Sequence, residues 1–159
     1  MPYSSAAIAN AFLERGKKAR HAIDPMKIQK LVYYANGYYV AKTNGAPLVD
    51  EFFEAWKFGP VLPSLYYEFQ QYGADGIKEF AYDPDGRHYA IPPDEDLANK
   101  VIEFVWQRFG SLDATDLSRR THKKGGPWER VIAEQDGIIY RNKDIPTSYI
   151  HEYFSKLVS

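Results

Sequence analysis

Cysteine is absent from this chain of 159 residues. Its absence excludes disulfide bonds, thiolate catalysis and zinc sites built on cysteine. An excess of one charge is also missing, because 20 lysine and arginine residues stand against 21 aspartate and glutamate residues, for a net charge of −1. A near-neutral chain has no overall field that attracts nucleic acid or an anionic membrane. Either role would need a local basic patch.

Long apolar runs are also missing from the chain, and we expect no targeting segment. The N-terminal apolar stretch Ala6 to Leu13 is short, has no basic region before it and is followed at once by Glu14 and Arg15. It therefore does not fit a signal peptide. No apolar run approaches the roughly 20 residues that a membrane-spanning helix needs. We expect a soluble, cytoplasmic protein without a membrane partner.

Aromatic residues are the compositional surplus, at 16% of the chain, with 13 Tyr, 9 Phe and 3 Trp. Tyrosine packs along its ring and hydrogen-bonds at its hydroxyl, so this surplus favours a contact surface as well as an aromatic core. The hydrophobic share of 45% and the charged share of 26% are those of a globular protein. A chain of this length fits one domain with its own core, and we expect one domain spanning residues 1–159.

The stretch 54–64 organises the predicted fold. Its first half belongs to an aromatic strand expected over Phe52 to Phe58, which Gly59-Pro60 should end because proline cannot donate to a strand ladder. Pro63 then opens a helix. A corner of this kind fixes two elements relative to each other, and it contains no evident nucleophile, acid or metal ligand. The stretch therefore indicates a binding scaffold.

Periodicity and capping signals predict about six helices. The clearest follows Asp24, a good N-cap, with Pro25 at the tolerated first position. Its apolar face is expected to carry Ile28, Leu31, Val32, Ala35 and Tyr39. Gly37 in the middle of this helix costs roughly 1 kcal/mol relative to alanine, which indicates close approach of another backbone.

A turn sequence at 83–86, Asp-Pro-Asp-Gly, separates the apolar segments 80–82 and 88–91 and predicts a hairpin. Because an isolated hairpin is only marginally stable, we place it beside the strand Phe52 to Phe58. The predicted fold class is therefore α+β and mostly α-helical, with about six helices and a small antiparallel sheet of three strands.

The histidines do not form a metal-ligand pattern, since none of His21, His88, His122 and His151 is paired with another at helical spacing. Ser118 and His122 lie one helical turn apart, so a serine nucleophile with its base can be imagined. The pair lacks the strained elbow and oxyanion donors of acyl transfer, and the alternative for His122 is a helix end favoured by the dipole. We predict no catalytic residue, no metal and no cofactor, and we do not expect an enzyme.

One local basic cluster comprises Arg119, Arg120, His122, Lys123 and Lys124. It precedes a glycine pair and Trp128, and basic side chains beside an aromatic ring can hold a phosphate backbone or an acidic protein face. Two helices around a short glycine turn are also typical of a helix-turn-helix. The alternative is a solvated helix end.

Three stretches together resemble the Panacea domain family, the family of the SocA-like antitoxins and the phage-associated protein GepA. They are Lys-Ile-Gln-Lys-Leu-Val-Tyr-Tyr-Ala at 27–35 continuing to Pro47-Leu48, Glu-Ala-Trp-Lys-Phe-Gly-Pro-Val at 54–61, and Leu-Ser-Arg-Arg-Thr-His at 117–122 followed by Pro127-Trp128. They occur in the family's order and cover most of the chain, from about Lys27 to Phe154.

The resemblance implies a small cytoplasmic antitoxin that binds and neutralises a cognate toxin protein encoded nearby. SocA-like members act as proteolytic adaptors that hand the toxin to a ClpXP-type protease, whereas other members neutralise by direct binding. A nucleic-acid-binding, phage-associated regulator that uses the basic cluster is the alternative, and a hydrolase comes third. The residues do not identify the toxin or the oligomeric state.

Two sets of residues are distinguished, because motif residues of this type usually support a scaffold, whereas exposed tyrosines and cations favour contact. The family-motif set is expected to be mainly structural and comprises Trp56, Lys57, Phe58, Gly59, Pro60, Val61, Thr121, His122, Pro127 and Trp128. The set expected to contact the partner consists of exposed tyrosines and of cations from the basic cluster, namely Tyr33, Tyr34, Tyr38, Arg119, Arg120, Lys123 and Lys124.

Overall fold

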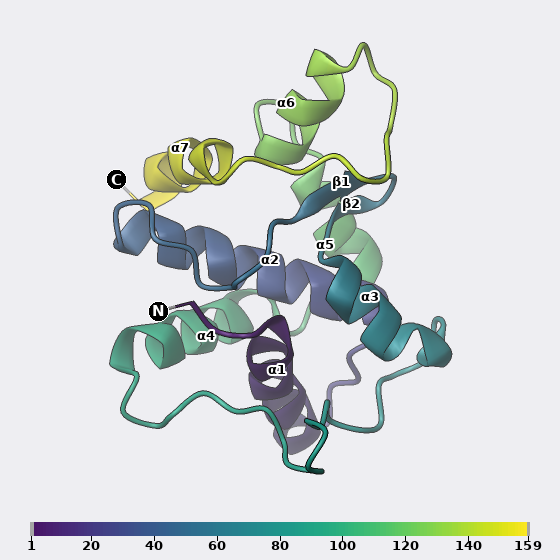
Figure 1. Cartoon of the computed structure of the whole chain (residues 1–159), viewed down its shortest axis with the longest axis vertical. Coiled ribbons are helices and arrows are strands. Elements are labelled where there is room, and N and C mark those ends of the chain that lie inside the picture. Colours follow the sequence, from purple (N-terminus) through teal and green to yellow (C-terminus); the bar gives the residue numbers. More distant parts are fainter. Residues whose placement is uncertain (1, 159) are drawn as a thin grey trace.

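The computed structural model describes residues 2–158 and confirms an α+β, mostly helical fold (Figure 1). Within that range there are seven α-helices, one 3₁₀ helix and one two-stranded sheet. Their bounds are α1 Ser5–Ala19, α2 Pro25–Lys42, β1 Glu54–Trp56, β2 Gly59–Val61, α3 Pro63–Phe69, η1 Gln70–Tyr72, α4 Asp96–Phe109, α5 Ala114–Thr121, α6 Pro127–Glu134 and α7 Thr147–Val158.

Helix α2 runs through the middle of the molecule, with α7 on one side and α1 and α4 on the other (Figure 1). It begins as its sequence predicts, because the Asp24 side chain accepts a hydrogen bond from the backbone N–H of Lys27 at 2.8 Å and Pro25 occupies the first turn. Helices α1, α3, α4, α5 and α7 and strand β2 all contact α2. As a result 13 of its 18 residues are buried, on every face rather than on one.

Buried amide side chains fasten loops to the helices. Gln29 on α2 exchanges two hydrogen bonds with the backbone of Leu62, at 2.8 and 3.0 Å. Asn36 accepts from the backbone N–H of Leu48, and Asn10 on α1 bonds both the N–H and the carbonyl of Ala81. Each amide satisfies backbone groups that burial would otherwise leave unpaired. Loops far apart in sequence are thereby held against the helical core.

The predicted three-stranded arrangement differs from the structure in its partners. Strand β1 pairs antiparallel with β2, so Gly59-Pro60 lies inside a strand instead of ending one. The other edge of β1 is covered by residues 143–145, through hydrogen bonds from Ala55 N–H to the Lys143 carbonyl and from Ile145 N–H to the Phe53 carbonyl. The turn at 83–86 forms as predicted, but its arms make only a bridge between Tyr82 and His88.

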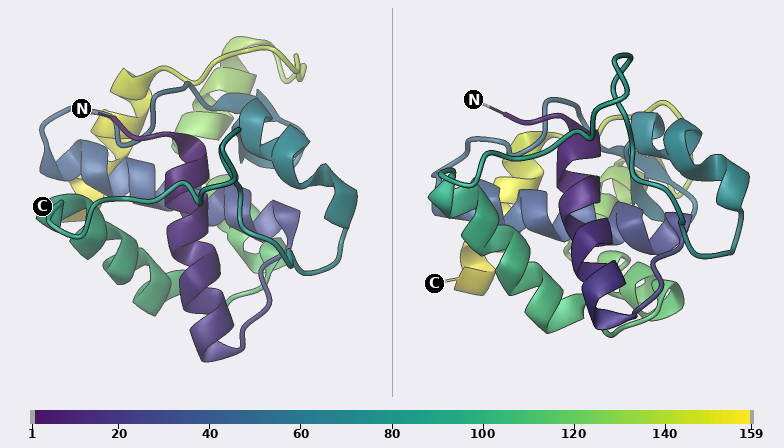
Figure 2. Two further views of the ribbon diagram at one scale, coloured as in Figure 1. Left: turned by 60° about the horizontal axis from the view of Figure 1, so that its bottom comes forward. Right: turned by 90° about the horizontal axis from the view of Figure 1, so that it is seen from below.

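The segment with that turn crosses α1 instead of joining the sheet (Figure 2). Asn10 on α1 donates hydrogen bonds to the carbonyls of both Ala81 and Tyr89. The backbone groups that would have paired with a strand are therefore used by an amide side chain. This is the physical reason that the expected third strand is not formed.

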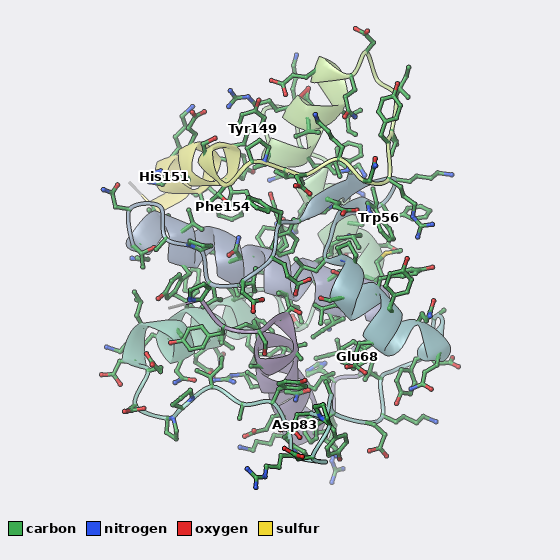
Figure 3. The ribbon with its side chains drawn as sticks, in the orientation of Figure 1. Trp56, Glu68, Asp83, Tyr149, His151 and Phe154 are labelled. Carbon is green, nitrogen blue, oxygen red and sulfur yellow. The ribbon has the colours of Figure 1, made fainter. Side chains whose placement is uncertain are left out.

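Gly37 makes room for an aromatic ring, and not for the second backbone that the sequence predicted. A Cβ atom at this position would overlap the ring of Phe154 on α7. Phe154 is fully buried, and Figure 3 shows it on the side of α7 that faces α2. The glycine therefore serves close packing of α7 on α2, with a side chain as the neighbour.

Candidate functional site

The hairpin of β1 and β2 turns through Lys57 and Phe58. Trp56 pairs with Gly59, whose φ of 113° lies in a region that L side chains rarely adopt. Pro60 is tolerated because it lies opposite Ala55, and the Ala55 N–H donates away from β2 to Lys143. The ladder therefore does not need the N–H that proline lacks at this position.

Side chains from α2, α5 and α6 bond the backbone carbonyls of the hairpin. Trp128 Nε1 donates to the Trp56 carbonyl at 2.6 Å, and Ser118 Oγ donates to the Phe58 carbonyl at 2.8 Å. His122 Nε2 lies 3.1 Å from the Lys57 carbonyl oxygen. These contacts fix the two turn residues and leave their side chains free to point outward.

The two most specific motif stretches therefore form one assembly. Thr121 Oγ1 bonds the Ser118 carbonyl at 2.7 Å and stands where a Cβ on Gly59 would lie. Gly59, Pro60, Thr121, Pro127 and Trp128 are all buried. Ser118 and Lys30 join them as residues that bond the hairpin. The sequence pointed to Ser118 only as a possible nucleophile beside His122, and it did not single out Lys30.

An apolar pocket of about 410 Å³ lies beside this hairpin, and we call it the hairpin pocket. Its walls come from the start of α2, the hairpin, α3 and the loop after α6. It is lined by Pro25, Met26, Gln29, Lys30, Trp56, Lys57, Phe58, Val61, Tyr66, Gly73, Ile139 and Arg141. Trp56 lies where the hairpin approaches α3 (Figure 3).

Aromatic and cationic side chains order the rim of the hairpin pocket. Trp56 and Tyr66 meet edge to face with ring centroids 5.1 Å apart, and the Arg141 guanidinium lies 3.9 Å from the Trp56 centroid. Phe58 remains 56% exposed at the tip of the turn. Of the large apolar side chains that are exposed in the described residues, Phe58, Tyr66 and Ile139 line this pocket.

Lys30 closes the inner end of the hairpin pocket. Its side chain is 1% exposed, and Nζ donates to the Pro60 carbonyl at 3.1 Å. Burial lowers the pKa of Lys30 from 10.5 to about 7, because a desolvated ammonium is disfavoured relative to the neutral amine. Among the described residues no carboxylate forms a salt bridge with it.

The prediction that Tyr33, Tyr34 and Tyr38 are exposed is wrong. Their side chains are 2%, 6% and 8% exposed, because α4, α5 and α7 pack around this part of α2. Their rings contact Phe53, Phe104, Phe109 and Phe154. Burial raises the pKa of Tyr33 and of Tyr34 above the ordinary value. They are core residues and cannot form a contact surface in this fold.

The cations of the basic cluster lie at the C-terminal end of α5 and just beyond it. Arg119, Arg120, Lys123 and Lys124 are exposed, and Arg119 pairs with Asp116 on its own helix at 3.0 Å. The aromatic ring expected beside them is not accessible, since Trp128 is buried against the hairpin. His122 belongs to the hairpin contacts and not to the cationic surface.

Ser118 and His122 do not form the arrangement of a nucleophile and its base. Ser118 Oγ donates to the Phe58 carbonyl, while His122 Nδ1 lies 2.6 Å from the Ser118 backbone carbonyl and not from the hydroxyl. Within residues 2–158 no group of three or more acidic or histidine side chains could hold a metal ion. In the same range no helix is long and apolar enough to cross a bilayer.

The fold and the hairpin pocket define a helical module built around one buried helix and a fixed, partly exposed hairpin. Residues 28–129 match the family described as Antitoxin SocA-like, Panacea domain, and the chain belongs to this family. The matched segment contains most of α2, the hairpin, and the side chains of α5 and α6 that hold the hairpin.

A curated relative agrees with this assignment. The chain is 38% identical over 136 residues to a protein named Antitoxin SocA from Caulobacter vibrioides (strain NA1000 / CB15N). The alignment covers 82% of this chain and 71% of the relative. No solved structure matches the chain.

Proposed function

We propose that this protein is an antitoxin that binds and neutralises a toxin protein, and that the hairpin pocket is the binding surface. The observation that carries the proposal is the exposed Phe58 ring at the mouth of an apolar pocket lined by family-motif residues. Membership of an antitoxin family supports the role. The relative named Antitoxin SocA supports it as well.

The construction of the hairpin suits recognition of another protein. Its carbonyls are bonded by Trp128, Ser118 and Lys30, so the backbone has little freedom left to lose when a partner binds. Pre-organised aromatic side chains contribute strongly to interfaces because their ordering cost is small. Phe58 and Tyr66 provide such rings, and Arg141 adds a residue type that is enriched at binding hot spots.

Toxin binding is a step common to the two routes that the family resemblance implies. Direct neutralisation needs only a stable complex, whereas a proteolytic adaptor must also pass the toxin to a ClpXP-type protease. The proposal is that binding occurs at the hairpin pocket in either case. The amount of toxin in cells that do or do not contain the protease distinguishes the two routes.

The test is co-expression with the protein encoded by the neighbouring gene, followed by co-purification. We expect Phe58→Ala to weaken the complex by about tenfold or more and to abolish rescue from toxicity, while its unfolding temperature stays close to that of the wild type. Tyr82→Ala is the matched control, because Tyr82 is also exposed but lies in the 80–91 segment outside the pocket.

Three outcomes are informative. A wild-type complex that Phe58→Ala weakens and Tyr82→Ala does not would support both the function and the site. If the wild type and Phe58→Ala bind the toxin equally well, the hairpin pocket is not the binding surface. No complex and no relief of toxicity with the wild type would contradict the antitoxin function itself.

A further inference from the structure

Lys30 is a buried cation-forming group with fewer acceptors than it has donors. An ammonium group carries three N–H donors, and the Pro60 carbonyl is the acceptor that Nζ has in the described structure. A buried charge is costly unless it is paired and hydrogen-bonded. Lys30 therefore has unused capacity for an anionic acceptor at the inner end of an apolar pocket.

The hairpin pocket is lined by charges of one sign. Lys30, Lys57 and Arg141 are among its lining residues, whereas no aspartate or glutamate is. Of the acidic residues near the pocket along the chain, Glu54 accepts from the Trp56 indole and Asp24 caps α2. The pocket is thus complementary to a ligand that is apolar along most of its length and negatively charged at its end.

A carboxylate fits this arrangement better than a phosphate. Phosphate sites usually supply several donors, from arginine forks or from successive backbone N–H groups. The buried part of this pocket supplies one ammonium group, and Val61, Phe58 and Trp56 are among the apolar residues that line the same pocket. One cation in an apolar wall matches a singly charged carboxylate attached to an apolar chain.

We infer that the hairpin pocket receives an apolar segment of the toxin that bears a carboxylate, with the carboxylate bound by Lys30 Nζ and the apolar part packed against Trp56 and Phe58. This inference rests on the proposed function and names the chemistry of the partner. Lys57 and Arg141 stand at the outer part of the pocket and favour an acidic surrounding sequence on the toxin.

Binding of this kind is coupled to protonation. Free Lys30 has a pKa of about 7, and a bound carboxylate raises it, because the ammonium form is the one that pairs. Affinity is therefore full below about pH 7 and falls as pH rises above it, by up to about tenfold per pH unit. The other titratable or charged groups on the elements around Lys30 include Lys27 on α2, Glu54 and Lys57 in the hairpin, Tyr66 on α3, Asp116, Arg119 and Arg120 on α5, His122 after α5, and Arg141 in the pocket wall.

The first experiment tests the pocket without the toxin. Protein labelled with ¹³C at the lysine Cε is titrated by NMR with and without 3-phenylpropionate, and Lys30→Met identifies the Lys30 signal. We expect the titration midpoint of Lys30, about 7 in the free protein, to rise with 3-phenylpropionate. The neutral isostere 3-phenylpropanamide should leave the midpoint unchanged. Equal effects of both compounds, or no effect of either, would overturn the inference.

The second experiment measures capture of the protein encoded by the neighbouring gene. We expect Lys30→Met to weaken capture at about pH 6.5 by tenfold or more, since a hydrogen bond to a charged group is lost. Wild-type capture should also weaken between about pH 6.5 and pH 8.5. Thermal unfolding of Lys30→Met checks that the variant is folded, because methionine keeps the length and the apolar stem of lysine.

The outcomes separate the inference from the proposed function. If the wild type and Lys30→Met capture the neighbouring protein equally well, and if capture does not change with pH, the inference is overturned and the antitoxin function stands. Binding of 3-phenylpropionate at Lys30 without any capture of the neighbouring protein would assign the pocket to a small carboxylate and overturn the protein partner.

Discussion

Lys30 shows how one residue can carry a stability cost within the core. Its folded pKa of about 7 lies below the ordinary value of 10.5, so between these values the unfolded chain holds a proton that the folded protein has released. The free energy of unfolding of the wild type therefore contains a contribution that rises with pH in this window. Below about pH 7 both states are protonated, and the full cost of the buried charge is present.

Replacing Lys30 by methionine tests this contribution. Methionine does not titrate, so the stability of Lys30→Met relative to the wild type should be greatest at and below about pH 7 and should decrease as pH rises toward about 9.5. The loss of the hydrogen bond to Pro60 shifts the whole curve but not its slope. Urea unfolding at several pH values measures the difference, in which the unchanged tyrosines and Lys27 cancel. A difference that is constant with pH would contradict the prediction.

Gly37 allows a prediction in which two effects have opposite signs. Helix propensity alone makes Gly37→Ala more stable by roughly 1 kcal/mol. The added methyl group overlaps the buried Phe154 ring, and such overpacking costs about 1–3 kcal/mol. We expect the packing effect to prevail, so that urea unfolding shows a destabilised variant. In the double variant Gly37→Ala with Phe154→Leu, the loss of unfolding free energy should be smaller than the sum of the losses in the two single variants. Losses that simply add would show that the cost of Gly37→Ala does not come from the Phe154 ring.

The tyrosines of α2 mark a limit of residue-level prediction. The spacing of Ile28, Leu31 and Ala35 correctly indicated one buried face, and Tyr33, Tyr34 and Tyr38 fell outside it. The period of the apolar residues identifies the buried face of a helix whose other faces are exposed to water. Here the other faces meet α4, α5 and α7, and tyrosine can be buried when its ring packs on other rings.

The hairpin is the element on which the candidate site depends. The sequence marked the stretch 54–64, but it placed the turn at Gly59-Pro60, two residues after the turn at Lys57-Phe58. A proline inside a strand argues against that strand unless its N–H faces away from the partner. That exception depends on register, and register here is fixed by contacts with α5, α6 and residues 143–145.

Gly59→Ala tests how tightly the hairpin is held. Its Cβ would lie 2.5 Å from Thr121 Oγ1, and the backbone would keep a positive φ, so we expect a loss of about 2 kcal/mol or more in unfolding free energy. Gly86→Ala is the matched control, because Gly86 also has a positive φ but a Cβ there would meet nothing within 4 Å. Similar losses of unfolding free energy in both variants would show that backbone strain, and not the contact with Thr121, causes the effect.

At the scale of the whole molecule, charge argues against the alternative function. The net charge is −1, the exposed cations of the basic cluster occupy one helix end, and Trp128 is not available for base stacking. Nucleic-acid binding depends on several phosphate contacts and weakens steeply with salt. A nucleic-acid-binding role therefore has little support from this surface.

We expect no retention on duplex DNA at about 150 mM salt. A variant with Arg119, Arg120, Lys123 and Lys124 changed to glutamate should behave like the wild type in a gel-shift or anisotropy measurement. Salt-sensitive binding that is lost in this variant would instead support the regulator. Capture of the neighbouring-gene protein by the same variant shows whether the basic cluster contributes to the proposed complex.

Local signals along the whole chain predicted the fold class but not the site. Helix caps, proline positions and motif order are local signals, and they gave the mostly helical α+β fold. The hairpin pocket draws its walls from segments as distant as Met26, Trp56 and Arg141. No spacing rule brings such segments together, and Lys30 in particular had the sequence context of an ordinary surface lysine on an amphipathic helix.

The burial of α2 on every face has a consequence for how such a protein can change over generations. Substitutions on α2 disturb several packed neighbours at once, so this helix has little room to vary. The exposed positions of the pocket rim, Phe58, Tyr66 and Ile139, are less constrained by packing. New partner specificities can therefore arise by changing a few rim side chains while the same helix continues to specify the fold.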